Sequence, residues 1–122
     1  MNEAATSGLE ESTRLLKAFA DPVRLRLLHL LTGGSEVCVC HLHEALGLPQ
    51  PTVSRHLAYL RKHGLVVGRK AGLWVHYQLA RPRSSLHRTL IDCVGTGLGH
   101  PDVFRQDRER LSQALSCCGG PE

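Results

Sequence analysis

The chain has 122 residues, a net charge of +4, five cysteines and an aromatic content of only 4%. This length suits one compact domain, and the scarcity of aromatic side chains indicates a mostly helical core built from Leu, Val and Ala. No apolar run approaches the roughly 20 residues that span a bilayer, and the N-terminal part carries acids where a signal peptide is apolar, so we expect a cytoplasmic protein without membrane contact.

Apolar residues at helical spacing predict a first helix over Leu9–Ala20. The pair Asp21-Pro22 predicts the start of a second helix, because Asp caps free backbone amides and Pro is tolerated at the first helical position. Gly33 ends that helix, and a short third helix follows from Val39 to Gly47.

A fourth helix is predicted from Pro51 to Gly64. Two short helices joined by a tight turn have the outline of a helix-turn-helix. The segments Leu65–Lys70 and Leu73–Leu79 then read as a β-hairpin, since apolar and polar residues alternate in the second of them. Such a hairpin beside the fourth helix would form a wing.

Two further helices are predicted after Pro82, one ending near Gly95 and one over Val103–Leu115. We therefore divide the chain into a flexible N-terminal arm at residues 1–8, a DNA-binding domain at 9–100, and a C-terminal helix with a Cys-Cys tail at 101–122.

The charge is distributed unevenly along the chain. No acid occurs between Ala45 and Ile91, whereas the flanks carry all eleven. The basic residues of that stretch are Arg55, Arg61, Lys62, Arg69, Lys70, Arg81, Arg83 and Arg88. A basic segment inside a nearly balanced chain is typical of a polyanion-binding face, although a merely solvated face is the alternative.

Three stretches resemble the ArsR/SmtB family of metal-sensing repressors: Asp21–Leu25 (DPVRL), Ser54–Val66 (SRHLAYLRKHGLV) and Gly72–Tyr77 (GLWVHY). The resemblance covers roughly residues 15–79. It implies a mostly helical winged helix-turn-helix fold with a β-hairpin wing, and a dimer in which the terminal helices make contact.

An odd number of cysteines argues against a closed disulfide framework and leaves thiols for metal or redox chemistry. The run Cys38-Val39-Cys40 resembles the arsenic-responsive branch of the family, in which such a motif at the start of the third helix captures trivalent arsenic or antimony. Side chains two residues apart on a helix point about 200° from one another, so one of these cysteines must lie outside regular helix to share an ion.

The third ligand stays open. The best-known arrangement of the family has a cysteine where this chain has His43, and imidazole suits zinc or cadmium better than arsenic. Cys93, Cys117, Cys118 or a small cellular thiol could supply the missing sulfur. The family's other metal sites fit less well, because residues 103–122 hold no histidine and no cysteine precedes Cys38.

The start of the fourth helix is the expected base-reading element. Its candidate DNA contacts are Gln50, Thr52, Ser54, Arg55 and His56. Arg55 is the first choice, because its guanidinium matches the O6/N7 pair of guanine. On the wing, Arg69 and Lys70 are expected to bind phosphate and to set salt dependence.

We therefore expect a homodimeric repressor, not an enzyme, that binds an inverted repeat with half-sites about 34 Å apart and is released by As(III) or Sb(III). No cofactor is expected for DNA binding itself. A cadmium, zinc or redox sensor of the same fold is the first alternative. A thiol-dependent reductase using Cys38 and Cys40, or Cys117 and Cys118, is the second, but no motif places a general base and a reductase leaves the acid-free segment without a reason.

Overall fold

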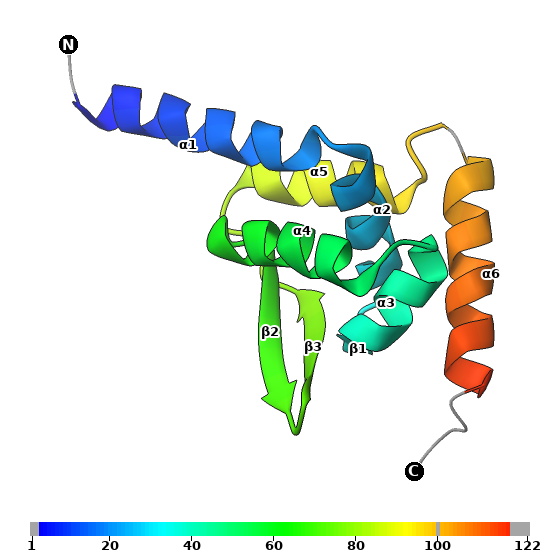
Figure 1. The fold of residues 1–122 in the computed structure, drawn as a ribbon. Coiled ribbons are helices and arrows are strands. Elements are labelled where there is room, and N and C mark those ends of the chain that lie inside the picture. The colour runs from blue at the N-terminus through cyan, green and yellow to red at the C-terminus, as the bar shows by residue number, and fades with distance from the viewer. Residues whose placement is uncertain (1–2, 100, 118–122) are drawn as a thin grey trace.

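The computed structural model describes residues 3–99 and 101–117. Six helices and a small sheet make up these residues (Figure 1). The elements are α1 (Glu3–Phe19), α2 (Pro22–Leu31), β1 (Val37–Cys38), α3 (Val39–Leu46), α4 (Gln50–Lys62), β2 (Val66–Ala71), β3 (Trp74–Leu79), α5 (Ser85–Gly95) and α6 (Pro101–Cys117). Across this described part of the chain, every helix is too short or too polar to pass through a bilayer.

The corner between α1 and α2 is built by the side chains of Asp21, Pro22 and Arg24. Asp21 Oδ1 accepts from the backbone N–H groups of Val23 and Arg24 at 2.8 and 3.1 Å, and Pro22 occupies the first turn of α2. Arg24 then donates to the carbonyl of Ala18 at 2.8 Å and lies over the ring of Tyr59 in α4 at 4.2 Å. This run therefore ties the end of α1 to both α2 and α4.

Aliphatic side chains fill the core, as the low aromatic content predicted. The largest fully buried apolar side chains come from α2, α3, α4, α5 and the start of the wing; they are Leu27, Leu28, Leu31, Leu42, Val53, Leu57, Leu60, Leu65, Val66 and Val94. Burying one such side chain stabilises a fold by about 1.5–3 kcal/mol relative to leaving it exposed, so this cluster holds the helix-turn-helix unit of α3 and α4 in place.

The sheet has three antiparallel strands in the order β1-β3-β2. The predicted hairpin is present as β2 and β3, with Gly72 at φ +64° in its turn. The sequence did not predict β1, which pairs Val37 with Tyr77 and Cys38 with His76. The two-residue strand joins the segment before α3 directly to the wing.

Helix α6 packs across α2 and α3 on the side opposite α1 (Figure 1). Its Asp107 is fully buried and accepts from Arg26 of α2 at 2.8 and 2.9 Å. Arg110 donates to the same carboxylate at 3.1 Å and to the carbonyl of Ala45 in α3 at 2.7 Å. We call these three charged side chains the Asp107 network.

One boundary prediction was wrong. Helix α1 begins at Glu3, before the start at Leu9 that the sequence predicted, and residues 3–8 belong to the helix. The prediction placed the helix start at the first apolar residue of the stripe, whereas the preceding segment Glu-Ala-Ala-Thr-Ser-Gly extends the helix without adding to that stripe.

Candidate thiol site and nucleic-acid interface

Cys38 lies at the junction of β1 and α3. It is the last residue of the strand and the N-cap of the helix, with extended backbone angles of φ −68° and ψ 142°. Its Sγ accepts from the backbone N–H of Cys40 at 3.3 Å, and the residue is only 5% exposed. The expectation that one cysteine lies outside regular helix is confirmed.

Cys40 occupies the first turn of α3, half-buried against the core. The cysteines within the described residues form no disulfide. The junction therefore offers thiols from both sides of one helix start, and thiolates are the ligands that select soft ions such as trivalent arsenic.

No third ligand joins these two sulfurs among residues 3–99 and 101–117, where no group of three potential ligands is found. His43 lies further along α3, and its Nδ1 donates to the carbonyl of Leu48 at 3.1 Å. Cys93 is exposed on α5, which packs against α2.

The remaining thiol candidates are at the chain's C-terminal end. Cys117 is the last residue of α6, although its side chain lies outside the described residues, as does all of Cys118. Helix α6 packs on α3 and runs antiparallel to it, so its C-terminal end lies toward the end of α3 that carries Cys40 (Figure 1). The end of α6 and the start of α3 therefore share one side of the molecule.

A second link joins this junction to the wing. The carboxylate of Glu36, two residues before Cys38, accepts from Arg69 of β2 through both of its oxygens, at 2.8 to 3.1 Å. The hydrogen bond from Arg69 lowers the pKa of Glu36, and the same contact raises the pKa of Arg69. Arg69 thus reaches a carboxylate of its own chain at the place where we predicted a phosphate contact.

Helix α4 presents a polar face at its start. Val53, Leu57 and Leu60 are buried, which turns Arg55 outward to solvent. Thr52 is half-exposed. Gln50 donates to the hydroxyl of Ser54 one turn later, so these two predicted contacts form one polar ridge.

His56 lies differently from the other predicted contacts. Its Nδ1 is 4.0 Å from Asp21 Oδ1 and 3.5 Å from Arg24 Nη1, and its side chain is 16% exposed. The ring therefore faces the α1–α2 corner, where it supports the position of α4. On the wing, Lys70 is exposed, and the tip carries Leu73 at 92% exposure.

The sequence also matches known proteins. Residues 21–67 match the family described as "Bacterial regulatory protein, arsR family". An HTH-type transcriptional regulator of Methanocaldococcus jannaschii is 41% identical over 83 residues, which is 68% of this chain and 93% of that protein. The arsenical resistance operon repressor of Escherichia coli is 51% identical over 67 residues, or 55% of this chain and 57% of the repressor.

Solved structures agree with the fold. The homodimeric winged helix-turn-helix DNA-binding domain of a possible ArsR-family regulator from Mycobacterium bovis superposes with a TM-score of 0.66 at 28% identity, covering 80% of this chain and 87% of that one. An antimony-specific transcriptional repressor superposes with a TM-score of 0.62 at 27% identity, covering 80% and 81%.

Proposed function

This chain belongs to the ArsR family of bacterial regulatory proteins, whose members are DNA-binding transcriptional regulators, and from that premise we propose a specific signal for it. It is a repressor that binds an inverted-repeat operator as a homodimer and leaves the DNA when As(III) or Sb(III) binds Cys38 and Cys40. The observation that carries this proposal is the position of Cys38, whose sulfur caps the helix packed against the recognition helix.

The first route from thiol to DNA runs through α3. Cys38 Sγ accepts from the amide of Cys40, and this contact helps to hold the first turn of α3. We propose that Cys38 Sγ turns away from the Cys40 amide when it shares an ion with the sulfur of Cys40, which weakens this cap. Loss of an N-cap costs about 0.5–2 kcal/mol with oxygen acceptors, and a sulfur cap contributes toward the low end of that range.

The second route runs through β1. Cys38 is paired with His76 of β3, and Val37 is paired with Tyr77. A shift of the Cys38 backbone therefore also displaces the wing. Glu36 adds a side-chain contact from the same segment to Arg69. Both elements proposed to touch DNA, α4 and the wing, are therefore in contact with the segment that carries the thiols.

The size of the expected switch follows from typical allosteric coupling. Coupling free energies of about 1–3 kcal/mol weaken operator binding roughly 5- to 150-fold. The loss of one cap and the distortion of two residue pairs between β1 and β3 are of this order, so no large rearrangement is needed.

In the DNA complex, we propose that α4 lies in the major groove with Arg55 on a guanine edge and with Thr52, Gln50 and Ser54 beside it. Lys70 binds phosphate from the wing. The homodimer is supported by the homodimeric domain from Mycobacterium bovis, and two-fold symmetry then places the half-sites about 34 Å apart. Binding to chromosomal DNA places the protein in the cytoplasm.

The names of the relatives support arsenic or antimony as the inducer, since they include an arsenical resistance operon repressor and an antimony-specific repressor. For the third ligand we propose Cys117 or Cys118, because the end of α6 lies toward the start of α3 (Figure 1). Three sulfurs then match the pyramidal coordination that trivalent arsenic takes.

One observation favours a zinc or cadmium sensor as the second candidate. Since His43 Nδ1 donates to the carbonyl of Leu48, Nε2 is the nitrogen that keeps a lone pair. A histidine whose other nitrogen donates to a carbonyl is oriented as metal-binding histidines are. Both candidates use Cys38 and Cys40, and they differ in whether His43 contributes.

The proposal is tested by fluorescence anisotropy with DNA from the protein's own upstream region, under reducing conditions, titrated with arsenite, antimonite, cadmium or zinc. Arsenite is expected to release the wild type and Cys93→Ser, and to leave Cys38→Ser bound. Release of Cys38→Ser by arsenite would refute the site. Release by cadmium or zinc alone, lost in His43→Gln, would establish the second candidate instead.

A further inference from the structure

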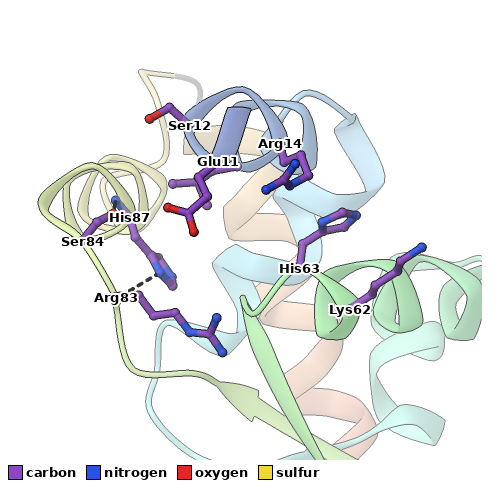
Figure 2. A pocket seen from close by; sticks show the side chains of 9 residues that line it. Glu11, Ser12, Arg14, Lys62, His63, Arg83, Ser84 and His87 are labelled. Atoms are coloured by element: carbon purple, nitrogen blue, oxygen red, sulfur yellow. Dashed lines mark hydrogen bonds between the residues drawn. The ribbon is translucent and has the colours of Figure 1, made fainter. Parts of the chain in front are cut away.

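A hollow of about 290 Å³ lies where α1, the end of α4 and the start of α5 meet (Figure 2). Its basic side chains come from three distant parts of the sequence: Arg14, Lys62 and Arg83. Glu11 is the acid in the lining. Among the described residues, none of the three basic side chains forms an ion pair, so the lining keeps an uncompensated positive charge.

His87 contributes a buried donor to this lining. The residue is only 3% exposed, and its Nδ1 accepts from the backbone N–H of Arg83 at 3.2 Å (Figure 2). Because Nδ1 accepts, the proton of the neutral ring must be on Nε2. Nε2 is buried and has no hydrogen-bond partner within the described chain, so one of the residues that line the hollow carries an N–H group that lacks an acceptor.

The electrostatic surroundings also suit an anion. Burial, followed by the charge of Arg83, lowers the pKa of His87 and keeps its ring neutral. Burial and the charges of Lys62 and Arg14 lower the pKa of His63, another lining residue. The N-terminus of α5, capped by Ser84, adds the positive end of a helix dipole at the same place.

The absence of a side chain at Gly64 leaves room for the guanidinium of Arg83 at the end of α4. Gly64 ends α4 at φ +78°, and a Cβ added there would lie 3.2 Å from Cζ of Arg83. The guanidinium of Arg83 therefore lies directly against the backbone that follows the recognition helix. Any group bound by Arg83 in the hollow also lies next to the end of α4.

We propose that this hollow is a binding site for a small molecule carrying an oxyanion group, a phosphate or a carboxylate. The oxyanion accepts from His87 Nε2 and pairs with Arg83, with Arg14 and Lys62 completing the cradle. The volume is near the lower limit of small-molecule sites and leaves room beyond the anionic group itself. This site is separate from Cys38 and Cys40 and does not depend on the proposed response to arsenic.

The first test is calorimetric titration of the full chain with inorganic phosphate and, separately, with acetate, in chloride buffers of matched ionic strength. At least one anion is expected to bind the wild type, and Arg83→Gln is expected to bind it about tenfold more weakly or worse, because a charge-assisted hydrogen bond is lost. Arg88→Gln, an exposed residue of α5 outside the lining, is the matched control and is expected to bind like the wild type. The anion that binds more tightly shows whether the oxyanion group of the ligand is a phosphate or a carboxylate.

The second test follows the His87 side chain of the wild type by nitrogen–proton correlation NMR and needs no variant. The ring is expected to be the Nε2–H tautomer, and the Nε2–H resonance is expected to shift when the anion binds. Absence of binding by both anions, equal binding by Arg83→Gln, or an unchanged Nε2–H resonance in the presence of a bound anion would each overturn the proposal.

Discussion

Among the residues that the structure describes, two arginine–carboxylate contacts connect segments far apart in the sequence, and they differ mainly in burial. In the Asp107 network the carboxylate is fully buried and Arg26 is 22% exposed. In the Glu36–Arg69 pair the side chains are 33% and 58% exposed. The first joins α6 to α2 and α3, whereas the second joins the segment before Cys38 to the wing.

This difference in burial separates a contact that stabilises the fold from one whose arginine can leave its carboxylate for another partner. A buried carboxylate that loses its partner is left uncompensated in a low-dielectric interior, which is strongly destabilising. An exposed pair is screened by water and salt, so its arginine can change partners at little cost. We therefore assign the Asp107 network to folding, and the Glu36–Arg69 pair to the control of how the wing meets phosphate.

The largest effect is expected from Asp107→Ala. Removing the carboxylate leaves Arg26 and Arg110 without their buried partner, and breaking a buried pair in this way costs about 3–5 kcal/mol. Because Arg26 keeps some contact with water, we expect a cost at the low end of this range, a decrease of about 3 kcal/mol in the free energy of unfolding. Urea denaturation measures this loss.

Asp102→Ala is the matched control for that experiment. Asp102 also pairs with an arginine in α6, but it is 80% exposed, so its removal is expected to leave the urea midpoint unchanged. Equal destabilisation by the two variants would contradict the distinction between the two kinds of contact.

A smaller effect is expected from protonation of His29, which lies beside the Asp107 network. The ring is 6% exposed and its centroid lies 4.6 Å from that of Phe104. Burial, then the charge of Arg108, lowers its pKa from the usual 6.5. The unfolded chain therefore binds a proton that the folded chain excludes, and the stability from this group is lost as the pH falls below 6.5.

The prediction is checked by urea denaturation of the wild type and of His29→Phe on both sides of that pH. Other groups that titrate contribute equally to both proteins. The difference between the two proteins in how the free energy of unfolding changes with pH therefore reports His29 alone. The wild type is expected to lose more stability on acidification. An equal pH dependence of the free energy of unfolding in the two proteins would show that the folded chain lets His29 take up a proton.

The smallest effect is expected from Glu36→Gln. This change frees Arg69 for phosphate, so operator binding is expected to tighten modestly and the salt dependence to steepen by about one unit on a log–log plot. Anisotropy at several salt concentrations measures both quantities. Glu44→Gln removes the same charge from an exposed position of α3, and identical slopes for the two variants would show that Glu36 does not restrain Arg69.

The local elements of the fold could be predicted from the sequence, because their signals lie within a few residues of one another. Asp21-Pro22 predicted the start of α2, and the alternation of apolar and polar residues along Leu73–Leu79 predicted the wing. The prediction that one of Cys38 and Cys40 leaves regular helix needed only helix geometry, and Cys38 is found in that position.

The contacts between distant segments could not be predicted in this way. Strand β1 has two residues and no periodicity, and it exists only because β3 supplies its partner. Asp107 carries no sequence signal of burial, since charged residues of an amphipathic helix are ordinarily exposed. The pairing of Glu36 with Arg69 and the inward position of His56 likewise depend on how the elements pack.

The most direct test of the central claim, that thiol occupancy is transmitted to the DNA-binding face through β1 and the cap of α3, is amide hydrogen exchange with and without arsenite. With arsenite we expect faster exchange at the amide of Cys40 and along the β1–β3 pairing at Val37 and Tyr77, in the wild type but not in Cys38→Ser. Release of DNA by arsenite with unchanged exchange at these amides would show that the signal does not pass through β1 and the cap of α3.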